Sequence, residues 1–318
     1  MSAEETLDLK TVCNGGKLQL SRALSLLEQS PAKMLNLLND CYQAPKAHVI
    51  GITGPPGVGK STLLAELIKT YRAEGRTVGV IAVDPSSKRS GGAFLGDRVR
   101  FSTDPEDQGV FVRSMAARER LGGLADLTIA AMVLMRAVFD IVLIETVGVG
   151  QSETDVSGVT DTVVFCVQPG SGDSLQFMKA GIAEIPHIAL VTKADMGKAA
   201  ERTKADLRGA LSLASENGGD WAVKILALSS SDRTGLTEFV SSVDEHYEWL
   251  KNEGRLFELR NQQAKQWLSE AVRDLYGKKG LSFIQEADLS LDLIDGISPF
   301  ELLAQIQKEF IFTRQQAL

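Results

Sequence analysis

A glycine-rich segment from Gly54 to Ser61 has the residue types and spacing of a phosphate-binding loop. Its sequence, GPPGVGKS, fits the pattern G-x-x-x-x-G-K-[ST], with an apolar run before it and a helical pattern after it. Glycines let backbone N–H groups surround phosphate oxygens, the Lys60 ammonium suits the β- and γ-phosphates, and the Ser61 hydroxyl suits Mg²⁺. We therefore predict a nucleoside triphosphate site formed by Gly54, Pro55, Pro56, Gly57, Val58, Gly59, Lys60, Ser61 and Thr62.

A second segment, ALVTKAD, is similar to the N-K-x-D motif that selects guanine. The Asp195 carboxylate can accept both the N1–H and N2–H of guanine, whereas adenine lacks this donor pair and would leave the carboxylate unpaired. Lys193 is expected to lie along the base plane. Thr192 replaces the usual Asn, which braces the phosphate loop, so we expect weaker nucleotide affinity with the guanine preference kept. A weaker candidate for a loop against the base is the small-residue run Ser229, Ser230 and Ser231.

Acidic residues follow two other apolar runs, at Asp84 and Glu145, and Asp97 follows in FLGDRVRF. Carboxylates at the carboxyl ends of strands in α/β folds face the ligand, and hard oxygen ligands suit Mg²⁺. Glu145 and Gly148 match a D-x-x-G pattern with Glu for Asp, so Gly148 can offer its N–H to the γ-phosphate, and 147–158 is a candidate switch. We predict that the metal ligands are Ser61, Asp84, Asp97 and Glu145, and that these acids act in catalysis with Lys60 and Gly148.

Alternating apolar runs and helical patterns must position these residues. Nearly all-apolar strands that alternate with helices are typical of a parallel sheet covered on both faces, so we predict an α/β fold of the P-loop type. Helical patterns include 60–71, 124–139 and 236–250. The predicted strands are 48–53, 77–83, 110–112, 141–144, 162–167, 188–191 and 223–228.

Three regions follow from these patterns: an N-terminal helical segment (1–46), a nucleotide-binding domain (47–253) and a C-terminal helical arm (254–318). In the arm, Gly277 and Gly280 are expected to break one helix, and Ser298-Pro299 is expected to begin another. The arm's apolar stripe of Leu268, Val272 and Leu275 suggests a homodimer. The alternative is that the arm folds back on its own domain.

The bulk composition excludes several classes of protein. A net charge of −7 without a long basic run argues against binding to nucleic acid or to an anionic membrane. The three cysteines and three histidines are dispersed, which argues against a disulfide framework and a Cys/His metal site. No apolar run reaches the ~20 residues of a membrane span, and the N-terminus does not resemble a secretory signal. We expect a cytoplasmic protein, or an organelle-matrix protein if a targeting segment has been removed.

The motifs as a set resemble the MeaB/ArgK family over roughly 15–271. The segments that carry the resemblance are GPPGVGKS, AVDPSSKRSGGAFLGDRVRF, IETVGVGQSE and VTKAD. The family comprises GTPases of the SIMIBI class that act as chaperones of methylmalonyl-CoA mutase and related cobalamin-dependent acyl-CoA mutases. The resemblance implies binding of GTP, GDP and Mg²⁺, a homodimer built by the C-terminal arm, gating of cobalamin loading, and protection or rescue of the mutase.

The resemblance also assigns individual residues. It places Asp84, Asp97 and Glu145 near Mg²⁺ and the γ-phosphate, and it makes 172–181 an additional switch toward the mutase, with Lys179 at its basic, functional position. The chain departs from the family at Thr192, in its shorter N-terminal helices, and in a segment of the R-[PS]-x-x-[ST]-x-G-x-L-G-G type, at Ala116, Ala117 and Arg118.

Two other functions remain open at this point. A small-molecule kinase would need an acceptor pocket and usually an Arg-rich lid, and no discrete lid domain is evident. A metallochaperone GTPase of the nickel-insertase kind would need a His- or Cys-rich metal site, whereas both residue types are dispersed.

Overall fold

The computed structural model describes residues 7–84, 104, 106–116, 126–146, 156–170, 186–214, 221–286 and 297–316. Several predicted functional residues lie outside these ranges, and for Asp84 and Ala116 only the backbone is described. The residues outside are Asp97, Ala117, Arg118, Gly148 and Lys179, together with most of the first candidate switch and all of the second.

A seven-stranded sheet forms the centre of the structure, in the order β3-β2-β4-β1-β5-β6-β7, and every strand pair is parallel. This confirms the predicted α/β fold. Strand β1 lies between β4 and β5, so the chain leaves it toward both sides, and such a reversal creates a ligand-binding crevice at the carboxyl edge. The strands are β1 (His48–Thr53), β2 (Val78–Asp84), β3 (Val110–Ala116), β4 (Ile141–Thr146), β5 (Thr162–Val167), β6 (Ile188–Val191) and β7 (Lys224–Ala227).

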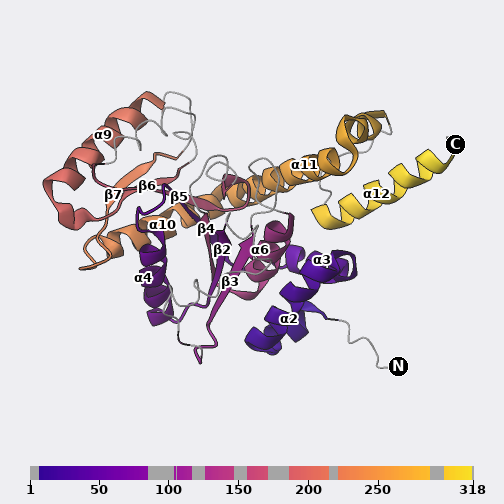
Figure 1. The fold of residues 1–318 in the computed structure, drawn as a ribbon, viewed down its shortest axis with the longest axis horizontal. Coiled ribbons are helices and arrows are strands. Elements are labelled where there is room, and N and C mark those ends of the chain that lie inside the picture. The colour runs from indigo at the N-terminus through magenta and orange to yellow at the C-terminus, as the bar shows by residue number, and fades with distance from the viewer. Residues whose placement is uncertain are drawn as a thin grey trace.

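Helices cover both faces of the sheet, and Figure 1 shows α4 and α6 on opposite sides of the central strands. One buried apolar cluster joins α4 and α10 to one face, and another joins α6 to the other face together with the terminal helices. Helix α9 covers the end of the sheet formed by β5, β6 and β7. Their bounds are α4 (Lys60–Ala73), α6 (Asp126–Val138), α9 (Lys198–Ala214) and α10 (Leu236–Lys251).

The N-terminal segment is helical, as predicted, and packs on α6 rather than standing apart. Its apolar positions Leu20, Leu24, Leu27, Leu37 and Leu38 are buried in the cluster that α6 shares. The helices are α1 (Leu9–Asn14), α2 (Gly16–Gln29), a 3₁₀ turn (Pro31–Met34) and α3 (Leu35–Gln43). In the part of the chain that the structure describes, no helix is long and apolar enough to cross a membrane.

The C-terminal arm consists of α11 (Arg255–Glu286) and α12 (Pro299–Gln316), which run beside each other (Figure 1). Gly277 kinks α11 with a φ of 65°, as predicted, whereas Gly280 lies within the helix. Ser298 caps α12, because its hydroxyl accepts a hydrogen bond from the Glu301 N–H at 3.1 Å. Pro299 occupies the first helical position, which confirms the expected start.

The apolar stripe of α11 does not need a second molecule to cover it. Leu268 and Val272 are both fully buried within the single chain, in the cluster that also contains Phe300 and Ile306 of α12. The part of the stripe that remains exposed is Leu275, at 51%. The stripe therefore cannot by itself be the reason for a dimer, because most of its apolar area is already removed from water by the arm's own fold.

Candidate nucleotide-binding site

The phosphate-binding loop lies between β1 and α4, at the strand-to-helix turn predicted for it. Gly54 has a φ of 137°, and a Cβ at this position would lie 2.3 Å from the backbone oxygen of Cys166 in β5. Gly57 and Gly59 also have positive φ, at 74° and 102°. Only glycine adopts this series of backbone angles without strain, so the loop shape depends on these three residues.

Lys60 folds over the loop with its ammonium group enclosed. Its Nζ donates hydrogen bonds to the carbonyl oxygens of Gly54 at 2.6 Å and Pro55 at 3.0 Å, and the residue is 6% exposed. A buried ammonium is costly unless it is paired or hydrogen-bonded, and carbonyl dipoles compensate it only in part. The loop therefore holds a positive charge at the helix N-terminus, where a phosphate group would bind.

Ser61 and Glu145 meet at the carboxyl end of β4. The Ser61 hydroxyl donates to Glu145 Oε1 at 2.8 Å, and Glu145 is buried on β4, in register with Ile52 of β1. Adjacent ligands in an octahedral Mg²⁺ shell with 2.0–2.1 Å bonds lie about 2.9 Å apart. Two hard oxygen atoms at this separation fit a Mg²⁺ site. The backbone of Asp84 ends β2, the neighbour of β4, at the same edge of the sheet.

Thr192 braces the phosphate loop although it is not the expected asparagine. Its buried hydroxyl lies 2.7 Å from the carbonyl oxygen of Val58 and 3.0 Å from that of Val167. The hydroxyl proton therefore lies between two acceptors, the Val58 carbonyl in the phosphate loop and the Val167 carbonyl at the end of β5. Asp195 follows in a short 3₁₀ turn (Ala194–Met196), is exposed, and forms no side-chain hydrogen bond within the described residues.

Lys193 links the base-selecting segment to the phosphate loop and to Gln168, a residue that the sequence did not single out. Its Nζ donates to the side chain of Gln168 at 2.6 Å and to the Gly57 carbonyl at 3.2 Å. Its backbone is left-handed, with a φ of 53°. Gln168 follows β5, which lies between β1 and β6. Its position directly after a central apolar strand was the available sequence signal.

The serine loop lies beside the base-selecting segment. The Ala194 N–H donates to the Leu228 carbonyl at 3.1 Å, and Leu228 directly precedes Ser229. Ser229 is fully buried and its hydroxyl lies 2.8 Å from that of Ser231. Ser230 is half-buried. The structure thus brings the phosphate loop, the ALVTKAD segment and the serine loop together by direct hydrogen bonds.

All three histidines, dispersed in sequence, gather at the opposite edge of the sheet. The Thr162 hydroxyl lies 2.7 Å from His48 Nε2 and 2.8 Å from His246 Nδ1. His187 stacks on His246 with ring centroids 4.1 Å apart, and His48 stacks on Tyr247 at 4.0 Å. Among the described residues no group of three His, Cys, Asp or Glu side chains is arranged to hold a metal ion. His48 and His246 are buried, so the cluster packs within the fold.

We expect the protein to lose stability as the pH falls from 6.5 toward about 5, before the carboxylates titrate. Burial lowers the pKa of His48 and of His187 from 6.5 to about 4, and lowers that of His246 to about 2. As the pH falls, the histidines of the unfolded chain bind protons while those of the folded protein stay neutral. The free energy of unfolding is therefore largest above pH 6.5 and decreases below it. Each histidine removes about 2 kcal/mol of unfolding free energy by about pH 5.

Urea denaturation across this pH range measures the effect. His246→Asn, which cannot titrate at this position, should have a shallower pH dependence whatever its absolute stability. A free energy of unfolding that stays level from about pH 7 to 5 would contradict burial of neutral histidines.

A parallel sheet with a glycine-rich phosphate loop after its central strand defines the class of P-loop nucleoside triphosphatases. The family model described as Methylmalonyl Co-A mutase-associated GTPase MeaB matches residues 20–282. The chain belongs to this family of GTPases.

Individual relatives agree with this assignment. The chain is 38% identical over 306 residues to a putative GTPase of Pyrococcus abyssi, covering 93% of this chain and 94% of the relative. It is 35% identical over 233 residues to the mitochondrial methylmalonic aciduria type A homolog of Mus musculus, covering 72% and 56%. A crystal structure of a LAO/AO transport system kinase has a TM-score of 0.69 and 25% identity, covering 98% of this chain and 99% of that one.

Proposed function

We propose that this protein binds GTP with Mg²⁺, hydrolyses it to GDP and phosphate, and acts as a chaperone of a cobalamin-dependent acyl-CoA mutase of the methylmalonyl-CoA type. It gates cofactor loading and protects or reactivates the mutase. The observation that carries the nucleotide part is the hydrogen-bonded junction of Lys193 and Thr192 with the phosphate loop. Family membership supports the mutase as client.

Each residue of the site has a proposed role. Lys60 neutralises the β- and γ-phosphates, Asp195 pairs with guanine, and Ser229–Ser231 lies against the base. Mg²⁺ would be held by Ser61, Glu145, Asp84 and Asp97, and it supplies positive charge to the phosphate oxygens during hydrolysis. Gly148, which lies outside the described residues, is proposed to offer its N–H to the γ-phosphate. Thr192 holds the phosphate loop through its hydroxyl group, and contact with the base is assigned to Asp195 and Lys193.

The connection after β4 offers a route from the γ-phosphate to the arm. Glu145, at the end of β4, precedes the candidate switch 147–158, and the chain returns at a 3₁₀ turn, Val156–Gly158. Gln263 of α11 donates hydrogen bonds at 2.8 Å to the carbonyl oxygens of both Ser157 and Thr160. We propose that these bonds carry a nucleotide-dependent change of the switch to the C-terminal arm, where it changes what a partner contacts.

We expect a cobalamin-dependent acyl-CoA mutase to bind this protein and raise its GTPase rate. A partner shifts the switch equilibrium by its differential affinity for the two arrangements, and preference for the hydrolysis-competent one raises turnover. Phosphate release is measured with and without purified mutase. Lys179→Ala should reduce the stimulation and keep basal GTP binding, whereas Lys204→Ala, in α9, serves as the control. A site that binds GTP normally but responds to no such mutase would contradict the client assignment.

We also propose a homodimer that uses the outer face of the arm, in place of the buried stripe. Leu275 of α11 and Ile311 of α12 are 51% and 53% exposed. They directly neighbour Tyr276 and Phe310, whose rings pack 4.2 Å apart between the two helices. Leu275 and Ile311 therefore lie next to residues of one helix–helix contact. The arm that contains this contact projects from the rest of the molecule (Figure 1). The protein is proposed to work in the cytoplasm, without contact to nucleic acid or membrane.

The double variant Leu275→Glu, Ile311→Glu should reduce the mass in light scattering from about twice 34.3 kDa to that of one chain, because charges cannot be buried in an apolar contact. Leu18→Glu is the matched control, since Leu18 is an exposed leucine, 78% accessible, in α2. A wild-type monomer, or a double variant that remains dimeric, would show that the arm is not the interface.

A further inference from the structure

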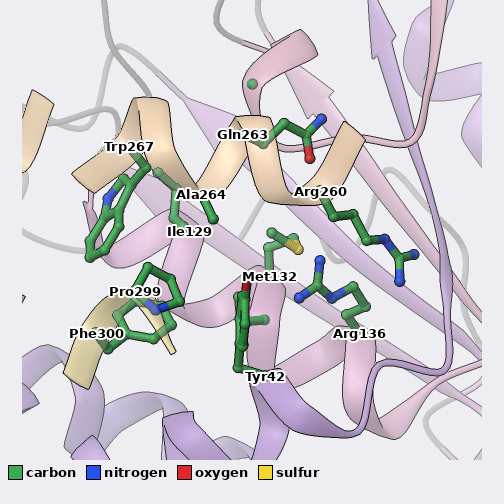
Figure 2. A pocket seen from close by; sticks show the side chains of 12 residues that line it. Tyr42, Ile129, Met132, Arg136, Arg260, Gln263, Ala264, Trp267, Pro299 and Phe300 are labelled. Atoms are coloured by element: carbon green, nitrogen blue, oxygen red, sulfur yellow. The ribbon is translucent and has the colours of Figure 1, made fainter. Parts of the chain in front are cut away.

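A pocket lies where the N-terminal helices, the nucleotide-binding domain and the arm meet. Figure 2 shows its wall, with Tyr42 of α3, Met132 and Arg136 of α6, Arg260 of α11 and Phe300 of α12 around one space. The cavity volume is about 30 Å³, and one water molecule needs about 10–15 Å³ in the same measure. It is therefore large enough for a molecule of a few heavy atoms, and it is separate from the phosphate loop.

The two arginines at the polar end of the pocket differ in their partners. Arg260 is paired with a carboxylate: its guanidinium makes bonds of 2.8 and 2.7 Å to the two carboxylate oxygens of buried Asp161, and another of 2.9 Å to the Ala47 carbonyl. Asp161 in turn accepts the Val49 N–H at 2.8 Å. This bidentate pair is the strong geometry for an arginine and a carboxylate, and it is complete without a ligand.

Arg136 lacks such a partner. It is 5% exposed, its Nε is buried without a hydrogen-bond partner, and no carboxylate among the described residues pairs with its guanidinium. Its guanidinium carbon lies 5.7 Å from the centre of the Tyr42 ring. Burial and the neighbouring Arg260 charge lower the pKa of Arg136 to about 10. A buried guanidinium in this state is costly unless an anion accompanies it.

We propose that this pocket is a binding site for a small monocarboxylate, with Arg136 as its anchor. The buried charges around it are two arginines and one aspartate, so one negative charge brings the group to neutrality. A carboxylate matches the planar fork of a guanidinium, which makes two parallel hydrogen bonds to it. The cavity volume selects a molecule no larger than a short-chain acid.

The rest of the pocket wall suits a short alkyl group. Opposite the arginines lie Ile129, Ala264, Trp267 and Phe300, and the rings of the last two pack 5.0 Å apart. In Figure 2 these four side chains gather at one end of the space and the guanidinium groups at the other, with Met132 between them. An anionic head beside a hydrocarbon tail, as in propionate, is complementary to both ends.

The site also touches the proposed switch. Gly158, the last residue of that segment, lines the pocket together with Gln263, which holds the carbonyl groups on either side of it. A bound carboxylate would bridge the arm, α6 and the end of the segment. Binding itself does not require nucleotide, so the proposal stands or falls independently of the GTPase function.

The test is calorimetry and thermal unfolding of the full chain with sodium propionate. Sodium chloride at equal ionic strength controls for salt, and propionamide controls for shape without charge. We expect propionate to bind with a Kd in the roughly millimolar range or tighter and to raise the melting temperature, whereas propionamide and chloride do not. Acetate, with a shorter tail, should bind more weakly than propionate.

Arg136→Met is the decisive variant. It should lower propionate affinity at least tenfold, while its melting temperature without ligand stays equal or rises, because methionine replaces an uncompensated charge with an apolar side chain of similar length. Arg208→Met, an exposed arginine in α9, should change neither property. Equal binding of propionate and propionamide, no propionate binding, or unchanged affinity in Arg136→Met would overturn the proposal.

Discussion

Replacing Lys60 with alanine is expected to abolish GTP hydrolysis and to remove most of the affinity for GTP. In the structure its ammonium is enclosed by the loop and held by the Gly54 and Pro55 carbonyls, so it is fixed before phosphate arrives. Hydrogen bonds to charged groups contribute about 1.5–3 kcal/mol each, so losing the phosphate contacts costs roughly a hundredfold or more in Kd. The same charge offsets the negative charge of the reacting phosphoryl group, so turnover is lost as well.

Calorimetric titration with GTP and Mg²⁺ measures the affinity. Lys69→Ala is the matched control: Lys69 belongs to the same helix, α4, and forms a surface ion pair with Glu66 at 2.8 Å. It should bind GTP as the parent does. If Lys60→Ala kept the parental affinity, the triphosphate would have to bind somewhere other than the loop after β1.

Changing Asp195 to asparagine is expected to shift the base preference from guanine toward xanthine. An aspartate accepts both guanine donors, whereas the amide of asparagine can accept one of them and can donate to the 2-oxo group of xanthine. Because hydrogen bonds to a charged acceptor contribute about 1.5–3 kcal/mol, the relative affinity should change tenfold or more. Asp195 is exposed, so its carboxylate oxygens are available to a base. The residues before it are held in place, Lys193 by the Gly57 carbonyl and Ala194 by the Leu228 carbonyl.

Competition between GTP and xanthosine triphosphate against a fluorescent guanine nucleotide measures this shift. Asp206→Asn, an exposed aspartate of α9, serves as the control and should leave the order of affinities unchanged. An Asp195→Asn variant that kept the parental preference for GTP would show that base selection depends on other groups.

The fold was predictable because each strand carries its own signal. Buried parallel strands are nearly all apolar, so the runs at 48–53, 162–167 and 188–191 matched β1, β5 and β6 at both ends. The glycine spacing predicted the loop after β1, where these glycines have positive φ, and the Ser298-Pro299 pair predicted the start of α12. These features are local in sequence, since they depend on a residue's own backbone or its immediate neighbours.

Contacts between distant segments were not predictable in the same way. The apolar stripe with Leu268 and Val272 indicates a buried helix face but not what covers it, and the cover is the same chain. Thr192 departs from the guanine motif, yet its hydroxyl reaches the Val58 carbonyl, a brace that spacing alone does not reveal. His48 and His246 are far apart in sequence and meet at Thr162 only through the sheet.

The most direct test of the GTPase account is phosphate release by the purified full chain, supplied in parallel with GTP and ATP at equal concentrations and with Mg²⁺. Each reaction is also run with a chelator and with small-molecule candidate acceptors. We predict phosphate release from GTP that depends on Mg²⁺, little release from ATP, and no phosphorylated acceptor. Equal use of ATP, or transfer of the phosphoryl group to an acceptor in place of water, would contradict the account.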